Sequence, residues 1–309
     1  MAVYRTALPQ LEPDRVFLTD GGLETDLVFN HGVDLPLFAA CDLLRSEEGR
    51  RMLRRYFDEY AEIATSNGLG LLLDTPTWRA NPDWTHRLGY DDREFAEVNR
   101  RAAQLAAEVR DDWEREGSPM PISGVIGPRG DGYVPSARQT IDEARTYHSA
   151  QIRVLADTEV DFVAAITMNY PEEAVGIALA AEDAGMPVVI SFTAETDGRL
   201  ASGHPVAEAI AIVDEASGSA PAYYMVNCSH PTHLPGDLSG LDRVRGFRAN
   251  ASSMSHAELD ESEVLDDGDP VELAGQFAEL RARMPSLTVL GGCCGTDSRH
   301  VAAIAEAAR

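Results

Sequence analysis

The chain contains no lysine, since reading its 309 residues through shows that all 26 basic side chains are arginine. Schiff-base catalysis, pyridoxal phosphate attachment and the phosphate-binding P-loop each need a lysine amine and are therefore excluded. Basic residues are also scarce beside the 51 acidic ones, and the net charge of -25 repels phosphate backbones and anionic membrane surfaces. We therefore expect neither nucleic acid nor a membrane among the partners.

Long apolar runs are absent as well. No stretch approaches the 18 apolar residues of a membrane-spanning helix. The first residues, MAVYRTALPQLEPDRV, lack the charged start and the apolar run of a secretory signal. These two absences predict a cytoplasmic protein. Four cysteines in a chain of this length are too few for a disulfide scaffold, and a cluster of them in a reducing compartment indicates metal binding or catalysis.

Short apolar runs alternate with longer amphipathic stretches along the whole sequence, as expected when each parallel strand is followed by a crossover helix. Eight such pairs predict an α/β protein with a single (β/α)8 TIM-barrel domain over residues 1–309. No GxGxxG motif follows a predicted strand, which disfavours a dinucleotide-binding fold. The predicted strands are 16–19, 70–73, 121–126, 162–166, 188–192, 223–226, 244–248 and 288–290, and helical spacing is clearest over 92–116, 140–157, 172–184, 206–216 and 271–283.

Three connections are long and polar, namely residues 78–91, 127–139 and 251–270. Each follows a predicted strand, so in a barrel it would lie on the C-terminal face, where active sites are built. These connections are candidate lids over a site. The alternative is a set of solvated loops, and the acidic run HAELDESEVLDDGD in the third is typical of such a surface.

Three of the four cysteines follow predicted strands. Cys228, in NCSHP, comes directly after the sixth strand, and Cys293 and Cys294, in GGCCGTD, come directly after the eighth. Three thiolates can hold Zn2+ while a fourth tetrahedral position stays open for substrate, which distinguishes a catalytic zinc site from a structural one. Cys41 has no such context and is predicted to lie in the core.

Adjacent cysteines can share one ion only where the backbone turns sharply, and Gly291, Gly292 and Gly295 supply the conformational freedom for that turn. Buried cysteines without a metal are the alternative. His230 and His233 follow Cys228 closely, so the residues alone also leave open a mixed cysteine and histidine site.

DGGLET over residues 20–25, NCSHP and GGCCGT together resemble the homocysteine S-methyltransferase family, and the resemblance covers nearly the whole chain. It implies a zinc barrel that binds homocysteine or a related thiol or selenol, deprotonates it on the metal and methylates it from a sulfonium or ammonium donor. It also implies that Cys228, Cys293 and Cys294 are the zinc ligands and catalytic residues. The resemblance further implies that Asp20, Gly21 and Gly22 line the acceptor pocket and that Thr75 contacts the acceptor. Glu24, Asn227 and Asn250 are the other predicted substrate-binding residues.

The chemistry of such a site is consistent with the resemblance. A thiol with a pKa near 8.5 is mostly protonated at neutral pH, and coordination to zinc removes its proton. Transfer of the methyl group then requires chiefly that thiolate, methyl and leaving group be aligned, so no general base is needed.

One position departs from the family pattern. The fourth strand usually ends with a Glu that holds the amino group of the acceptor, and this chain has Ile166 there. Either another carboxylate takes over, with Asp74, Glu24 and Glu195 the candidates, or the acceptor lacks that ammonium group. Aromatic side chains of the long connections could hold a cationic donor, the candidates being Trp78, Trp84, Tyr90 and Tyr133.

Two other functions fit the same residues less well. A zinc hydrolase is disfavoured because an all-thiolate ligand set weakens the Lewis acidity that water activation needs. A non-catalytic metal-binding or redox-sensing protein is disfavoured by the long loops around an open coordination position. The sequence leaves open whether the chain forms homo-oligomers.

Overall fold

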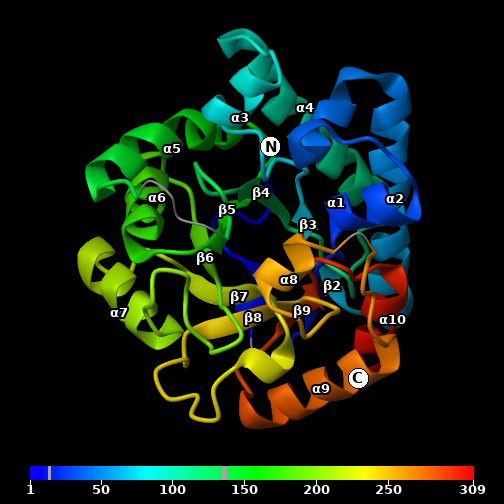
Figure 1. Ribbon diagram of the computed structural model, residues 1–309. Coiled ribbons are helices and arrows are strands. Elements are labelled where there is room, and N and C mark those ends of the chain that lie inside the picture. The colour runs from blue at the N-terminus through cyan, green and yellow to red at the C-terminus, as the bar shows by residue number, and fades with distance from the viewer. Residues whose placement is uncertain (13–14, 134–137, 263) are drawn as a thin grey trace.

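A computed structural model describes residues 1–12, 15–133, 138–262 and 264–309. Within these residues the chain forms nine parallel strands around a central axis, and the helices surround them on the outside (Figure 1). The strands are β1 (Phe17–Leu18), β2 (Gly70–Leu71), β3 (Leu73–Asp74), β4 (Ile122–Ile126), β5 (Phe162–Met168), β6 (Val188–Thr193), β7 (Tyr223–Ser229), β8 (Val244–Ala249) and β9 (Val289–Gly292).

Ten α-helices occur in the same residues: α1 (Leu23–Thr25), α2 (Glu47–Asn67), α3 (Pro82–Arg87), α4 (Asp92–Trp113), α5 (Ile141–Ala156), α6 (Pro171–Asp183), α7 (Val206–Ser217), α8 (His256–Asp260), α9 (Pro270–Arg283) and α10 (Ser298–Ala307). The 3-10 helical segments are η1 (Pro9–Leu11), η3 (Pro36–Phe38), η4 (Ala40–Arg45) and η5 (Pro231–His233), and η2 (Asp26–Asn30) is a π-helical segment.

The sheet closes through the second predicted strand, which the structure divides into β2 and β3 at Leu72. The strand order runs β2-β1-β9-β8-β7-β6-β5-β4-β3, so the two halves of this one segment lie at the two ends of the sheet. Leu72 donates its backbone N–H to Leu18 on one side, and Leu73 donates to Pro121 on the other. Residues 70–74 therefore act as one strand of the barrel, between β1 and β4, which confirms the predicted α/β barrel of eight strands.

The barrel interior is filled by large side chains, as the fold requires. Phe17, Phe162 and Tyr223 are fully buried inside the strands and pack with Ile166. Gly70 makes room for one of them, because a Cβ atom at this position would lie 2.2 Å from the Phe17 ring. The larger core lies between the sheet and the surrounding helices.

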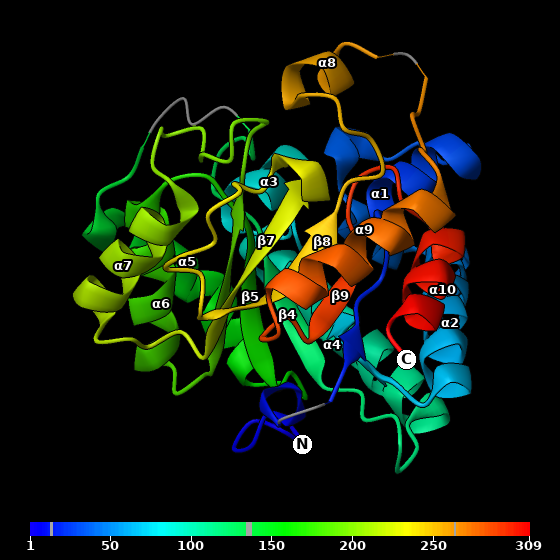
Figure 2. The same ribbon diagram turned by 90° about the horizontal axis from the view of Figure 1, so that it is seen from below.

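The N-terminal segment packs against the end of the barrel opposite α8 (Figure 2). The buried carboxylate of Asp161 holds this segment: it accepts the backbone N–H groups of Val3 and Tyr4 at 2.7 Å and that of Ile122 at 2.8 Å. Oδ1 accepts the two N-terminal N–H groups, and Oδ2 accepts that of Ile122 and also accepts from the buried guanidinium of Arg110 at 3.0 Å. One carboxylate thus joins the N-terminal segment, β4 and α4.

The three long connections follow β3, β4 and β8 and so lie at the C-terminal ends of the strands, although residues 134–137 and 263 fall outside the described residues. The connection 78–91 contains α3, which begins where Asn81 accepts from the backbone N–H of Trp84 and Pro82 takes the first helical position. The third carries α8 above the barrel mouth (Figure 2). Among the described residues, no helix combines the length and apolarity needed to cross a bilayer.

Replacement of Asp161 by Asn should destabilise the fold, because it leaves the Arg110 guanidinium buried without a charge partner. The expected loss is about 3–5 kcal/mol in the free energy of unfolding, measured by urea denaturation. Asp157→Asn removes an exposed carboxylate nearby and should change stability by no more than about 0.5 kcal/mol. Equal denaturation midpoints for the two variants would contradict the assigned role of Asp161.

Candidate active site

The sulfur atoms of Cys228, Cys293 and Cys294 converge at the C-terminal end of the barrel, all within 4.8 Å of one another. Cys228 belongs to β7, and the other two directly follow β9. The Sγ atoms of Cys228 and Cys294 are 4.0 Å apart. Two sulfurs bound to one tetrahedral zinc at 2.3 Å would lie about 3.8 Å apart, so the cluster has dimensions that suit zinc.

The backbone around these cysteines is shaped for close approach. Cys228 has a positive φ of 49°, a conformation that costs a non-glycine residue of order 1–3 kcal/mol and is concentrated at functional sites. At Gly292 a Cβ atom would lie 1.9 Å from Thr296 Oγ1, and at Gly22 it would lie 2.5 Å from the Cys293 carbonyl oxygen. The glycines therefore allow the loop after β9 to pack directly against the loop after β1.

A negative charge on one of the three sulfurs makes deprotonation of the other two less favourable. Hydrogen bonds from Cys293 and Cys294 lower the pKa of Cys228 well below its usual value. The hydrogen bonds with Cys228 raise the pKa of Cys293 to about 12 and raise the pKa of Cys294 well above its usual value. Without a cation the cluster favours a single thiolate. A divalent ion supplies the positive charge that three adjacent thiolates need, and an all-sulfur donor set is one that zinc accepts.

Two neighbouring side chains contact the sulfurs. Tyr133 lies with its hydroxyl 3.4 Å from Cys228 Sγ and 3.6 Å from Cys294 Sγ. Asn227 donates to Cys293 Sγ at 4.0 Å and to Thr167 Oγ1 at 3.0 Å, and its amide oxygen accepts from the Thr167 backbone N–H at 3.0 Å. Thr167, like Cys228, has a positive φ, here 68°. Asn227 thus joins the two strained strand ends.

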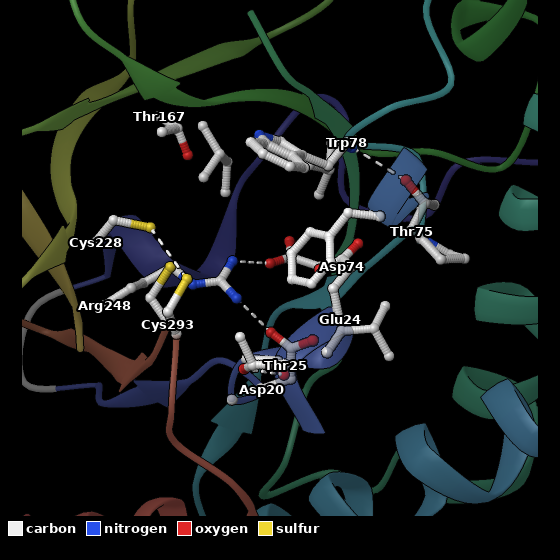
Figure 3. Close-up of a pocket in the computed structure, with 18 of the residues that line it drawn as sticks. Asp20, Glu24, Thr25, Asp74, Thr75, Trp78, Thr167, Cys228, Arg248 and Cys293 are labelled. Atoms are coloured by element: carbon white, nitrogen blue, oxygen red, sulfur yellow. Dashed lines mark hydrogen bonds and ion pairs between the residues drawn. The ribbon is translucent and has the colours of Figure 1, made fainter. Parts of the chain in front are cut away.

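A buried arginine joins the carboxylates at the pocket floor to the cysteine loop. Arg248, on β8, forms ion pairs with Asp20, after β1, and with Asp74, at the end of β3. Its Nε donates to the carbonyl oxygen of Gly292 at 3.1 Å, directly before the paired cysteines. Figure 3 shows this guanidinium reaching toward both carboxylates. One side chain therefore links the ends of four strands.

The electrostatics of this network follow from burial. Burial away from water raises the pKa of Asp20 to about 7, although Arg248 opposes the shift and Tyr56 donates to the carboxylate at 3.3 Å. Burial also disfavours the charge of Arg248, but Asp74 and Asp20 more than offset it and raise its pKa. Arg248 is therefore a permanent cation in the pocket.

The cavity enclosed by these residues has about 620 Å³ of empty space, including its open mouth. Figure 3 shows Cys228 and Cys293 on one side and Trp78 and Glu24 on the other. Of the residues predicted from sequence, the cavity is lined by Asp20, Gly21, Gly22, Glu24, Thr75, Cys228, Cys293 and Cys294, with Ile166, Asp74, Trp78 and Tyr133 also present. Thr75 has a structural role as well, because its Oγ1 accepts from the Val125 backbone N–H at 3.0 Å.

Glu24 is half-buried, and no other described side chain donates a hydrogen bond or forms an ion pair with its carboxylate. Burial raises its pKa to about 7, and the charge of Cys293 adds to the increase. Its own backbone amide and the positive charges of Arg79 and Arg248 oppose the shift. This carboxylate faces the cavity at an energetic cost that a bound cation would relieve.

Several predicted residues do not line the cavity. Asn227 lies behind the sulfurs, and Asn250 lies with Glu195 and His256 in a separate small depression. His230 contacts Thr232 Oγ1 and His233 contacts the Ser253 carbonyl oxygen, and neither joins the sulfur cluster within the described part of the chain.

Three of the four aromatic candidates have an arginine near the ring. The guanidinium of Arg79 lies 4.1 Å from the Trp84 ring centroid and 4.9 Å from that of Trp78, and the guanidinium of Arg45 lies 3.7 Å from the Tyr90 ring centroid. Trp78 and Tyr133 remain as aromatic walls of the cavity. Cys41 is fully buried in the hydrophobic core, as predicted.

Sequence reasoning missed Arg248. A signal was present, because the seventh predicted strand contains two arginines, Arg245 and Arg248, with Arg248 at its C-terminal end, and Asp20 and Asp74 stand at two other strand ends. Carboxylates that meet at the mouth of a barrel need a cation, and Arg248 is the arginine that a strand delivers there.

Comparisons with known proteins agree on the family. The homocysteine S-methyltransferase family model matches residues 17–308. Homocysteine S-methyltransferase 4 of Zea mays is 27% identical over an alignment that covers 94% of this chain and 89% of that protein. Selenocysteine methyltransferase of Astragalus bisulcatus is 25% identical, with 91% and 89% covered.

Among solved structures, the metallated form of the homocysteine methyltransferase MmuM from Escherichia coli superposes with a TM-score of 0.73 at 19% identity, covering 96% of each chain. The oxidised form of the same protein gives a TM-score of 0.76 at 17% identity, covering 98% of this chain and 99% of that one. These structures share the barrel fold. Because the family model spans nearly all of the sequence, the chain belongs to the homocysteine S-methyltransferase family and is a methyltransferase.

Proposed function

We propose that this protein is a zinc-dependent methyltransferase that moves a methyl group from a sulfonium or ammonium donor to the thiol or selenol of homocysteine or a related acceptor. The observation that carries the proposal is the cluster of three cysteine sulfurs opening into a cavity of about 620 Å³. The names of the relatives from Zea mays and Astragalus bisulcatus support acceptors of this chemical class.

Cys228, Cys293 and Cys294 would hold the zinc ion, because their sulfurs have the spacing and the softness that the ion accepts. A zinc ion held there would supply the Lewis acidity that removes the proton of the acceptor thiol at neutral pH. Asn227 and Arg248 support the ligand set from behind, through Cys293 Sγ and the Gly292 carbonyl oxygen respectively.

The walls of the cavity exclude water from the reacting sulfur. Leu23, Val125 and Ile166 contribute apolar surface, and Phe38 and Trp78 contribute aromatic surface. A thiolate that is poorly hydrated loses less solvation when it attacks, and a fixed cavity holds donor and acceptor in line. The chain therefore contributes position and environment to the transfer and needs no proton acceptor of its own.

The charge of the cavity favours a cationic donor. Asp20, Asp74 and Glu24 line it, and Arg248 is the one cationic side chain in its lining as far as the structure describes the chain. Three carboxylates around one guanidinium leave the pocket negative, which attracts a cation and repels an anion. The Trp78 ring adds a face on which a sulfonium or quaternary ammonium group can rest.

The purified protein should bind about one zinc ion per chain, with sulfur ligands near 2.3 Å in X-ray absorption spectra. Cys228→Ser and Cys293→Ser each remove a soft ligand and should lose most of the metal. Cys41→Ser is the matched control, because Cys41 is buried in the core away from the cluster, and it should keep the metal. A spectrum dominated by nitrogen ligands would refute the assignment.

The charge of the methyl donor should decide whether the protein uses it, which a panel of donors with a labelled methyl group can test. Sulfonium or quaternary ammonium donors should methylate homocysteine, whereas a methylated folate with its anionic glutamate tail should not. Trp78→Leu removes the aromatic face but keeps an apolar wall, and it should raise the KM for the cationic donor by roughly fivefold, about 1 kcal/mol. Efficient use of the folate and no use of any cationic donor would contradict the proposed donor class.

A further inference from the structure

The carboxylates near the cavity differ in what they already bind. Asp20 and Asp74 are ion-paired with Arg248, each of whose three guanidinium nitrogens donates to a partner within the protein. The carboxylate of Glu195 is hydrogen-bonded to His256 Nδ1 at 2.9 Å and lies outside the lining of the main cavity. Glu24 lines the cavity and has no side-chain partner in the part of the chain that the structure describes.

Glu24 faces the same cavity as the cysteine cluster, from its opposite side (Figure 3). It is the second residue of α1, and α1 begins where Gly22 packs against the Cys293 carbonyl oxygen. A ligand whose sulfur reaches the cysteine cluster extends through this cavity, and its other groups can face the Glu24 carboxylate.

Arg79, whose charge also acts on Glu24, forms no ion pair with it among the described residues. The guanidinium of Arg79 donates to the Leu37 carbonyl oxygen and lies over the rings of Trp84 and Trp78, 4.1 Å and 4.9 Å from their centroids. Elsewhere on the cavity wall, Ile166 offers no hydrogen-bond acceptor in its side chain. Glu24 is thus the carboxylate that can receive a cation from a ligand.

We propose that Glu24 receives the α-ammonium group of the amino-acid acceptor and so determines specificity for acceptors that carry this group. The inference rests on the proposed function, in which the acceptor is homocysteine or a related amino acid. An ammonium group has three N–H donors that match a carboxylate. A fully methylated sulfonium or ammonium donor has none and suits the Trp78 face instead.

The test compares homocysteine with 4-sulfanylbutanoate, the same thiol without its amino group. Zinc-loaded wild type should show a 10- to 100-fold lower KM for homocysteine, the range expected when an ammonium loses its hydrogen-bonded partner. Glu24→Gln keeps the size of the side chain and removes its charge. It should raise the KM for homocysteine by the same factor and should not raise the KM for 4-sulfanylbutanoate, because that thiol has no ammonium group to lose a partner.

A binding measurement without turnover accompanies the kinetics. Calorimetry on the metal-free chain should show that Glu24→Gln weakens binding of methionine 10- to 100-fold and does not weaken binding of 4-(methylsulfanyl)butanoate. Glu59→Gln is the matched control, because Glu59 is exposed on α2 and has no partner among the described residues. It should behave as wild type in both assays.

The outcomes separate the two proposals. If wild type methylates neither thiol, the proposed function fails, while the calorimetry still decides the role of Glu24. If wild type does not distinguish the two thiols, or if Glu24→Gln weakens both ligands equally, the role of Glu24 is refuted. A Glu24→Gln variant that loses affinity for the methyl donor alone would assign the carboxylate to the donor and would also overturn the inference.

Discussion

The ion-pair network of Arg248 with Asp20 and Asp74 determines much of the geometry at the barrel mouth. Its members come from β8, from the loop after β1 and from the end of β3, and the Nε of Arg248 donates to the last residue of β9. Breaking a buried pair of this kind costs about 3–5 kcal/mol, because the remaining charges stay buried. The guanidinium thus fixes the loop that carries Cys293 relative to the floor of the pocket, and it occupies two carboxylates that would otherwise be free to bind ligand.

The pocket concentrates features that lower stability. Thr167 and Cys228 hold positive φ angles, and burial raises the pKa values of Asp20 and Glu24 to about 7. When the pKa of a carboxylate is higher in the folded chain than in the unfolded chain, its protonated form stabilises the folded state. This stabilisation is complete only at a pH below the pKa of the unfolded chain. That contribution is lost as the pH rises through 7. The energetic cost of charged Asp20 and Glu24 at neutral pH is the kind that functional sites bear and that the rest of the fold must offset.

Much of the fold was predictable from the sequence, because the alternation of strands and helices is a local pattern. All eight predicted strands form. Residues 70–74 carry two labels, β2 and β3, because this one extended segment pairs with β1 in its first half and with β4 in its second. The helix α3 was missed within the connection 78–91, where the signal is short: an Asn cap followed by Pro82.

The meeting of the three cysteines follows from barrel topology alone, since strand ends share one mouth. What local patterns could not predict are the partners of the carboxylates. Arg248 lies 174 residues from Asp74 and 228 from Asp20 along the chain, so no spacing rule connects them. Once these partners are known, Glu24 differs from the other two candidate carboxylates, because Asp74 and Glu195 have partners and Glu24 has none among the described residues. The sequence alone does not distinguish the three. The sequence also could not predict that Asn227 and Asn250 lie outside the cavity lining, because a position at a strand end does not decide whether a side chain faces the cavity or the layer behind it.

Proton release on thiol binding tests directly whether the cysteine cluster activates its acceptor through a metal. Calorimetric titration of the zinc-loaded protein with homocysteine at pH 7, repeated in buffers of different ionisation enthalpy, gives the number of protons released. A free thiol with a pKa near 8.5 is almost fully protonated at this pH, so activation at the metal predicts about one proton released per thiol bound. Binding with no proton release would contradict the assignment of Cys228, Cys293 and Cys294 as the centre that activates the thiol.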